Sequence, residues 1–367
     1  MSCCSGPSRA GSRCSSGARR CSAEASRRAR EGYATMSRSG AAAMKVLITG
    51  GSGFVGLALA ERLLADSAEI CLFSAAAPPA ALAQRLACDR LHIVTGDVRS
   101  AAELDAALAA SGATHLVHAA AITPGPEREL REARAILDVN IGGTVNAVER
   151  AAAAGLTRVV VLSSVAVYGF APPAASGLYE EAGSAPAPTA LYGISKLAAE
   201  QTALRLGALY GLDIRVVRLG PVFGPWEYAT GLRDALSPHR QILAAARIGV
   251  AVVLPRPMRA DWLYSRDVGA GLAALLRTSA LNHALYNLGA GRISDLPEWC
   301  AALGRAGLTA DWRLAREGEQ PDIRYNLAQD RAALATSRIE ADTGFRPGSD
   351  LFAQATDYLG WADGLPL

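Results

Sequence analysis

The chain lacks the features that mark membrane proteins and nucleic-acid-binding proteins. None of its apolar runs approaches the roughly 20 residues that a membrane helix needs. Charged residues make up only 19% of the chain, and the formal net charge is +3. This positive balance comes from residues 1–43, which hold eight arginines and two glutamates, so the remainder is mildly acidic. We therefore expect no membrane partner and no nucleic-acid partner.

Cysteine is also scarce outside the first 43 residues. Cys71, Cys88 and Cys300 are too widely separated to form a disulfide framework, and the cysteines before them show no zinc-ligand spacing. The pattern predicts no metal site and favours a reducing, cytoplasmic compartment. Half of the residues are apolar, which is enough for a large core.

Residues 1–43 are rich in Ser, Arg, Ala and Gly and show no apolar periodicity. We expect either a mis-called start upstream of Met44 or a disordered N-terminal extension. An organelle transit peptide, which would also be rich in Arg and Ser, is the third alternative. The first predicted strand begins directly after Met44.

From Met44 onwards, short β-branched runs alternate with Ala- and Leu-rich helical stretches. This alternation predicts an α/β fold with a Rossmann-type, doubly wound parallel sheet. We expect a dinucleotide-binding domain over residues 44–220 and a smaller, mainly substrate-binding lobe over residues 221–367, interleaved with the last sheet elements. The predicted strands are Lys45–Thr49, Glu69–Phe73, Leu91–Val94, His115–His118, Arg158–Leu162 and Asp213–Arg218. The predicted helices include Phe54–Ala65, Ala101–Ala110, Ile136–Ala154 and Ala190–Tyr210.

A glycine-rich segment, Thr49-Gly-Gly-Ser-Gly-Phe-Val-Gly56, connects the first predicted strand to the first predicted helix. Gly50, Gly53 and Gly56 permit a tight turn and a close approach of the backbone to a pyrophosphate. The amides at the N-terminus of the helix attract the same negative charge. The segment therefore predicts a dinucleotide site.

The end of the second strand lacks the acid that would hydrogen-bond the adenosine ribose of NAD. This strand ends Cys71-Leu-Phe-Ser74, and Ser74 could bond either a hydroxyl or a phosphate oxygen. The choice between NAD and NADP therefore stays open. Asp97, after the third strand, could meet the adenine amino group or cap the helix near Ser100. His118 is expected to be a packed residue at the end of the fourth strand.

A tyrosine and a lysine lie one helical turn apart in Tyr192-Gly-Ile-Ser-Lys196, and Ser164 follows the fifth strand. A free phenol has a pKa of about 10, which is too high for an efficient base at neutral pH. The Lys196 ammonium and a positive nicotinamide ring both favour the phenolate and so lower this pKa. We expect Ser164 to hold a substrate hydroxyl while Tyr192 takes its proton. Lys196 can also reach the nicotinamide ribose.

These segments together resemble the extended short-chain dehydrogenase/reductase family, the group that contains nucleotide-sugar epimerases and dehydratases. The resemblance covers roughly residues 44–288 and includes the motifs described above. It also rests on Val139–Thr144, Ser163–Gly169, Arg218–Pro225 and Asp267-Val268.

This resemblance implies roles for particular residues. It implies Ser164, Tyr192 and Lys196 as a catalytic triad, with Asn140 in the supporting proton network. It also implies a set of residues around the dinucleotide, namely Gly50, Gly53, Val55, Gly56, Asp97, Val98 and Ala119.

The chain departs from similar family members at several positions. Val165 and Ala166 stand where dehydrating and decarboxylating members carry acids, which argues against those two reactions. Gly220 replaces an asparagine that holds the substrate diphosphate in sugar epimerases, and Arg259 lies one residue out of step with their arginine. The sequence thus predicts a differently shaped pocket, in which Arg233 and Arg259 are candidate anion contacts.

We therefore expect an NAD(P)-dependent oxidoreductase that transfers a hydride at a secondary alcohol of a sugar-like or sugar-acid substrate. A nucleotide-sugar epimerase with the same triad is the alternative, and a non-catalytic dinucleotide-binding protein is a minor one. The long helices predicted over Ile136–Ala154 and Ala190–Tyr210 could pair across a homodimer, as relatives of this fold often do.

Overall fold

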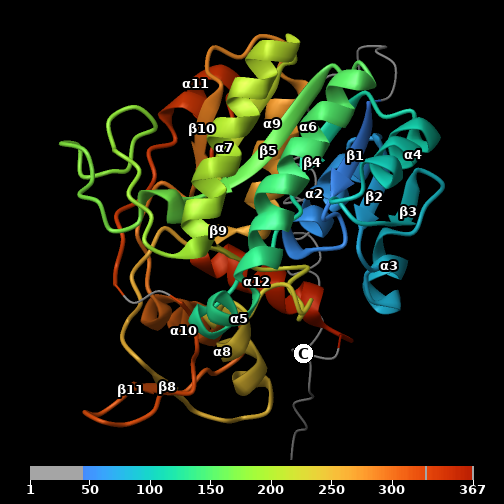
Figure 1. Cartoon of the computed structure of the whole chain (residues 1–367). Helices are drawn as coiled ribbons and strands as arrows, with labels where there is room; N and C mark the ends of the chain where they lie inside the picture. Colours follow the sequence, from blue (N-terminus) through green and yellow to red (C-terminus); the bar gives the residue numbers. More distant parts are fainter. Residues whose placement is uncertain (1–43, 327–328, 366–367) are drawn as a thin grey trace, which may run out of the picture. The chain divides into compact units, whose positions relative to one another are not determined.

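Seven parallel strands form the central sheet of the computed structural model, which describes residues 44–326 and 329–365 (Figure 1). The expectations for residues 1–43 lie outside the described residues. Across the sheet the strands follow the order β10 (Leu285–Leu288), β6 (Ile214–Leu219), β5 (Arg158–Ser164), β4 (His115–His118), β1 (Lys45–Thr49), β2 (Glu69–Ser74) and β3 (Leu91–Thr95). This order, in which the winding reverses between β1 and β4, confirms the predicted Rossmann-type sheet.

Helices cover both faces of the sheet (Figure 1). Val46 and Ile48 of β1 point into one hydrophobic core and Leu47 points into the other, as the two-residue period of a strand requires. The first core is shared with α2 (Phe54–Ala65) and α9 (Ser265–Arg277), and the short α3 (Ala80–Leu86) follows β2. The second core is shared with α4 (Ala101–Ser111), α6 (Gly143–Ala153) and α7 (Leu191–Tyr210).

The helix predicted over Ile136–Ala154 is wrong in its extent. Helical structure begins with α5 (Pro126–Leu137), passes through a π-helical turn at Asp138–Gly142 and continues as α6. Pro126 suits the first position of a helix because proline has no amide hydrogen to lose there. The π turn coincides with the buried side chain of Asn140, whose hydrogen bonds to distant segments are described below.

The chain after β6 builds smaller elements and also returns to the main sheet. Strand β10 pairs with β6 at one edge, and α9 packs along α2. Two short parallel sheets join β7 (Val222–Phe223) to β9 (Leu263–Tyr264) and β8 (Val252–Leu254) to β11 (Trp312–Leu314). The remaining helices are α8 (Pro238–Arg247), α10 (Leu296–Arg305), α11 (Ser337–Thr343) and α12 (Leu351–Ala362).

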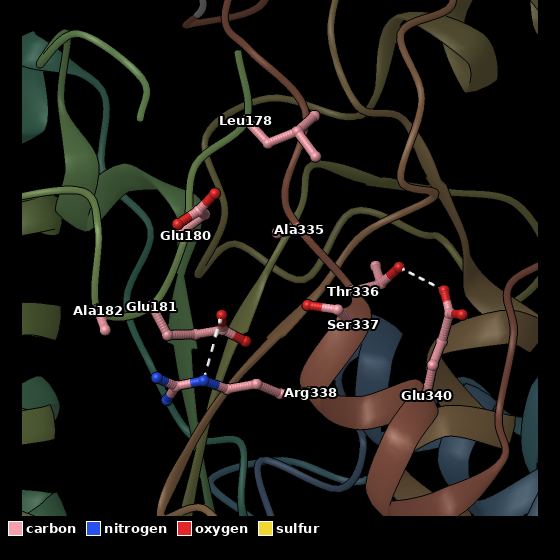
Figure 2. Close-up of a pocket in the computed structure, with 9 residues that line it drawn as sticks. All are labelled: Leu178, Glu180, Glu181, Ala182, Ala335, Thr336, Ser337, Arg338 and Glu340. Carbon is pink, nitrogen blue, oxygen red and sulfur yellow. Dashed lines mark hydrogen bonds and ion pairs between the residues drawn. The ribbon is translucent and has the colours of Figure 1, made fainter. Parts of the chain in front are cut away.

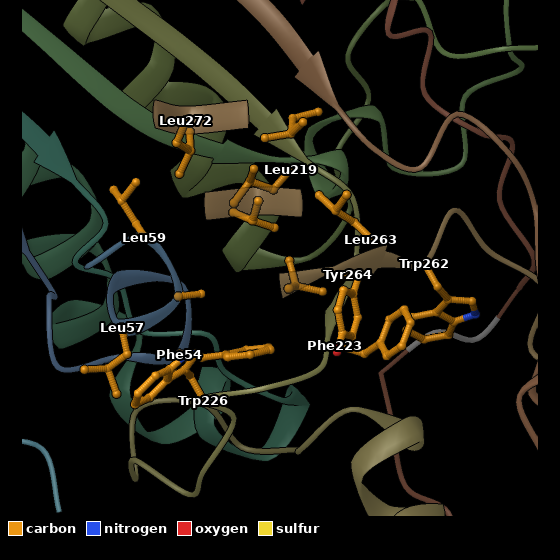
Figure 3. Close-up of a cluster of buried hydrophobic side chains, with 14 of the residues drawn as sticks. Phe54, Leu57, Leu59, Leu219, Phe223, Trp226, Trp262, Leu263, Tyr264 and Leu272 are labelled. Atoms are coloured by element: carbon orange, nitrogen blue, oxygen red, sulfur yellow. The ribbon is translucent and has the colours of Figure 1, made fainter. Parts of the chain in front are cut away.

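Buried aromatic side chains connect these smaller elements to the sheet (Figure 3). Trp226, Trp262 and Trp299 are all fully buried. The His239 ring stacks on Phe223 with 3.9 Å between ring centroids, inside the same cluster. Trp226, Trp262 and Trp299, which follow Gly220 in the sequence, therefore form part of the core, whereas Trp312 is exposed.

A buried ion pair fixes α7 against the sheet. The Arg218 guanidinium of β6 donates to both carboxylate oxygens of Glu200 in α7, and each side chain is only 3% exposed. Glu200 also accepts a hydrogen bond from the Ser163 hydroxyl at 3.0 Å. The Arg218 guanidinium lies over the Tyr168 ring, 4.7 Å from its centroid. These contacts set the position of α7, which carries Tyr192 and Lys196, relative to the end of β5.

Replacing Arg218 by Met should therefore destabilise the protein strongly, since it leaves the Glu200 carboxylate buried and without its cation. We expect a loss of about 3–5 kcal/mol in the free energy of unfolding, measured by urea denaturation. The double variant Arg218→Met/Glu200→Met should regain much of this loss.

Glu69→Gln is the matched control, because it breaks the exposed pair between Lys45 and Glu69. It should cost no more than about 1 kcal/mol. Equal losses for Arg218→Met and Glu69→Gln would contradict the structural role of the buried pair.

Candidate active site

Tyr192 and Ser164 meet at the carboxyl edge of the sheet. The phenol of Tyr192, in the first turn of α7, lies close enough to the hydroxyls of Ser164 and Thr123 for both to act on its ionisation. Burial raises the pKa of Tyr192, while these two hydroxyls and the charge of Arg233 act to lower it. The structure thus brings together the tyrosine and serine that the sequence singled out, and adds Thr123 to them.

Lys196 lies one turn along α7 and points toward β5. Its ammonium donates to the carbonyl of Leu162 at 2.8 Å. Burial lowers the pKa of Lys196 to about 8, because the charged form loses its hydration. Lys196 therefore still carries most of its charge at neutral pH and loses it in mildly alkaline solution.

Asn140 ties the π-helical turn to two other parts of the site. Its amide oxygen accepts from the backbone N–H of Ile122 at 2.8 Å. Its amide nitrogen donates to the carbonyl of Ile122 and to the hydroxyl of Ser195, each at 3.0 Å. Asn140 thereby links the loop after β4, which carries Thr123, to the first turn of α7.

His118 is a packed strand-end residue, as expected. It is 1% exposed, and its two ring nitrogens are hydrogen-bonded to the hydroxyls of Thr49 and Thr144 at 2.8 and 3.0 Å. Burial, followed by the nearby charge of Lys196, lowers the pKa of His118 to about 3. The ring is therefore neutral in the working pH range and joins β1, β4 and α6.

The glycine-rich loop has the backbone geometry that a pyrophosphate requires. Gly50 has a positive φ of 66°, and a Cβ there would lie 2.6 Å from the backbone nitrogen of Ala120. Gly53 caps α2 without a side-chain hydrogen bond, and the first turn of this described helix holds no acid. The Ser52 amide donates to Ser74 at 2.9 Å, and the buried Ser52 hydroxyl has no partner within the described residues. The uncapped amides at the start of α2 and the Ser52 hydroxyl can therefore donate hydrogen bonds to a negatively charged group.

The other residues implied for the dinucleotide lie around this loop. A Cβ on Gly56 would lie 2.6 Å from the Cα of Gly51, which explains the need for glycine at this close crossing. Val55 and Ala119 are half-buried, and Val98 is buried.

Asp97 does not cap α4, so that alternative is wrong. Ser100 is the capping residue and accepts from the Glu103 amide at 3.3 Å. The Asp97 carboxylate instead accepts from the Arg99 amide and guanidinium. The Arg99 guanidinium also lowers the pKa of Asp97, mainly through these hydrogen bonds.

The two candidate anion contacts lie in different surroundings. The Arg233 guanidinium forms an ion pair with Glu227 at 2.8 Å, and its charge reaches Tyr192. Arg259 is exposed, and its backbone amide donates to Asp330 at 3.0 Å. Of these two arginines, Arg233 is the one whose charge acts on Tyr192.

The departures from sugar epimerases also have a structural basis. A Cβ on Gly220 would lie 2.8 Å from the carbonyl oxygen of Asp261, so a larger residue has no room there. The Asp261 carboxylate accepts from the backbone amides of Ala290 and Leu334 and is 1% exposed. Burial raises the pKa of Asp261 to about 6. Asp261 therefore organises the backbone behind the site.

Four residues of the site were not found from the sequence. Thr123 could have been recognised, because it follows β4 on the same sheet edge as Ser164. Glu227 and Tyr228 belong to the unusual stretch that starts at Trp226. Glu227 pairs with the nearby Arg233, whereas the partner of Tyr228, Ser52, lies far away in the sequence. Tyr325 interacts with Arg233 across more than 90 residues, and no local pattern announces it.

A separate cavity of about 380 Å³ lies between the loop around Glu180 and the start of α11 (Figure 2). Glu181 faces Arg338 at 3.7 Å, and the Thr336 hydroxyl donates to Glu340 at 2.8 Å. None of the proposed catalytic residues lines this cavity. No group of three or more metal-binding side chains occurs within the described residues, and none of their helices is long and apolar enough to cross a membrane.

Comparisons with known proteins agree on one family. Residues 46–289 match the model of the NAD dependent epimerase/dehydratase family. The chain is 32% identical to 2'-dehydrokanamycin reductase of Streptomyces kanamyceticus over 67% of this chain and 61% of that protein, so it spans less than two thirds of that relative. It is 25% identical to dTDP-L-rhamnose 4-epimerase of Burkholderia thailandensis over 83% of this chain and 90% of the relative.

Solved structures show the same fold. The structure of MoeE5 in complex with UDP-glucuronic acid and NAD is 25% identical in sequence, with a TM-score of 0.69. The match covers 87% of this chain and 98% of that one. A dTDP-glucose 4,6-dehydratase from Bacillus anthracis, 19% identical with a TM-score of 0.71, supports the fold alone.

The lowered pKa of Lys196 predicts how stability depends on pH. Between the folded value of about 8 and the ordinary value of 10.5, the unfolded chain binds the proton that the folded protein has lost. The stabilisation of the parent relative to Lys196→Met should therefore be flat below pH 8 and rise by about 2 kcal/mol between pH 8 and 9.5. Urea denaturation of both proteins across this range measures it. A difference that stays constant from pH 7 to 9.5 would contradict the buried, partly discharged lysine.

Proposed function

The chain belongs to the NAD dependent epimerase/dehydratase family, and on this premise we propose that it is an NAD(P)-dependent oxidoreductase. Its substrate is a sugar-like or sugar-acid molecule that reacts at a secondary alcohol. The observation that carries this proposal is the grouping of the Tyr192 phenol with the Ser164 hydroxyl at the end of β5, with Lys196 one turn away. A base, a hydroxyl-binding group and a cation are the parts that alcohol oxidation needs.

The chain's own residues divide the work of proton transfer. Ser164 orients the substrate hydroxyl and stabilises the oxygen as charge develops on it. Tyr192 removes the hydroxyl proton, and Asn140 holds the loop after β4 and the first turn of α7 in place around it. Lys196 favours the phenolate and contacts the nicotinamide ribose. When bound, the nicotinamide ring supplies the site that accepts the hydride.

The glycine-rich loop would hold the cofactor's pyrophosphate, through the uncapped amides of α2 and the Ser52 hydroxyl. Gly50, Gly53, Val55, Gly56, Asp97, Val98 and Ala119 would surround the rest of the dinucleotide. Ser74, already bonded to the loop amide of Ser52, could still donate its proton to a ribose oxygen. NAD is favoured as the cofactor, because the family description and the MoeE5 complex both name it.

A nucleotide-sugar epimerase with the same triad is the second candidate. Relatives named as sugar epimerases, and a structural neighbour bound to UDP-glucuronic acid, support it. The lack of room at Gly220 argues against an epimerase-like diphosphate clamp. Dehydration is disfavoured, since Val165 and Ala166 cannot move a proton. One relative is named as a reductase, and this name favours an oxidoreductase over an epimerase.

The protein is also proposed to act in the cytoplasm as a homodimer. Cys71, Cys88 and Cys300 are free, which fits a reducing compartment. Leu130 of α5 and Ile194 of α7 are large, exposed apolar side chains on neighbouring helices. A second copy packed on these helices would cover them.

The full chain, loaded with NAD or NADP and offered sugar acids, polyols, free sugars and nucleotide sugars, tests the reaction. Nicotinamide absorbance is followed, and the sugars from the same tubes are analysed. We expect net reduction of the cofactor with at least one sugar-like alcohol. An altered sugar without net reduction would establish an epimerase instead.

Tyr192→Phe removes the proton acceptor while it preserves the shape of the side chain. We expect turnover to fall by about 100-fold or more, because general-base catalysis typically contributes 10²–10⁴. A folded variant that keeps more than a few per cent of turnover would rule out the proposed role of Tyr192.

A further inference from the structure

Residues 227–234, the covering segment, are attached to two loops at the carboxyl edge of the sheet. The Tyr228 hydroxyl donates to the carbonyl of Ser52 at 2.7 Å, in the glycine-rich loop. The backbone of Thr123, after β4, forms a parallel β-bridge with Arg233. Its amide donates to Leu232 at 2.8 Å. The covering segment is therefore attached to the same threonine whose hydroxyl acts on the Tyr192 phenol.

Arg233 is held firmly within this segment. Its guanidinium carbon lies 5.8 Å from the centroid of the Phe54 ring and 5.9 Å from that of Tyr325. Its ion-pair partner, Glu227, has a fully buried side chain. Glu227 also accepts from the amide and the hydroxyl of Ser237, at the start of α8. Aromatic rings and a fixed carboxylate thus prevent the guanidinium from turning away to solvent.

We propose that Arg233, aligned through Thr123 and held by Glu227, is a positioning residue whose charge stabilises the Tyr192 phenolate. Glu227 sets the strength of this effect, because it neutralises part of the same charge. The proposal rests on the proposed role of Tyr192 as the base. It adds a second positive charge to the site, because Lys196 is the only cation of the proposed triad.

Other groups around Tyr192 support a separate role for Arg233. Lys196 uses its ammonium on the Leu162 carbonyl and loses its charge near pH 8. An arginine keeps its charge throughout the working pH range. The charge of Arg233 lowers the pKa of Tyr192, and Tyr192 in turn raises the pKa of Arg233. The titratable groups that face Tyr192 are Lys196 on α7, Glu129 on α5, Tyr325, and the Arg233–Glu227 pair.

The test measures the ionisation of residue 192 directly, without a substrate. The full chain carries 3,5-difluorotyrosine in place of Tyr192, since fluorination lowers the phenol pKa into a range where the protein stays folded. Its ionisation is followed by ultraviolet absorbance, with the Tyr192→Phe protein as the background. Arg233→Gln should raise the pKa of the fluorinated phenol by about one unit, the size of effect that a single nearby charge has at an effective dielectric constant of about 20.

Two further variants test the direction in which the pKa of the fluorinated phenol moves. Arg233→Lys should keep the pKa of the phenol close to its value in the parent protein, because lysine also carries a positive charge. Glu227→Gln should move the pKa in the opposite direction, downward, because Arg233 then acts without its counter-charge. A merely structural role for either residue would not produce shifts of opposite sign.

Arg346→Gln is the matched control for the loss of one positive charge, since Arg346 has an 81% exposed side chain. It should leave the pKa unchanged within about 0.2 units. If Arg233→Gln fails to fold, Arg233→Gln/Glu227→Gln is measured instead, because it leaves no buried unpaired charge. Its pKa should lie above that of Glu227→Gln by about one unit.

A shift below about 0.3 units for Arg233→Gln overturns the proposal, even if Tyr192→Phe abolishes turnover. If the pKa of the phenol shifts clearly but the protein turns over no sugar, the role of Arg233 is supported and the proposed reaction is wrong. The two failures are therefore distinguishable.

Discussion

The site depends on the order of the parallel strands. Because β1, β4 and β5 are neighbours and all run in the same direction, the loops that follow them emerge side by side at one edge. The glycine-rich loop, Thr123 and Ser164 therefore come together although the loop and Ser164 are more than 100 residues apart in the chain. Ligands of open α/β sheets bind at this edge, where the winding reverses. Tyr192 and Lys196 come to the same edge on a helix, α7.

Buried charges then hold these loops and α7 in register. Arg218 and Glu200 join β6 to α7 under the site, and Arg233 and Glu227 lie in the segment that is bonded to Thr123 and Ser52. A buried ion pair adds little net stability, since desolvation offsets most of the attraction. Its geometry is nonetheless demanding, because each carboxylate also accepts from a serine hydroxyl. These pairs therefore constrain the position of the site more than they stabilise the fold.

The sequence predicted the parts of the fold that local patterns determine. The bounds of β1, β4 and α2 agree with the predictions, because β-branched runs and Ala- and Leu-rich stretches mark them without ambiguity. The break at Asp138–Gly142 was missed, since it reflects bonds from Asn140 to Ile122 and Ser195 that only the folded chain creates. The helix cap at Ser100 could have been preferred over Asp97 from the sequence, because Glu103 follows it at capping-box spacing. Arg233 was singled out, but its partners Thr123 and Tyr325 come from segments about 90 to 110 residues away.

The state of the arginines bears on which substrates the proposed enzyme can accept. Arg218 is neutralised by Glu200 and lies over the Tyr168 ring, so it offers no charge to a ligand. Arg233 is shared between Glu227 and the neighbourhood of Tyr192, so an anionic substrate group would have to compete with a fixed carboxylate. A diphosphate carries two such groups and also meets a backbone that leaves no room for a side chain at Gly220. Within the proposed function, a sugar or sugar acid without a diphosphate is thus the better match, because a single carboxylate or hydroxyl competes less with Glu227 for Arg233 than a diphosphate would.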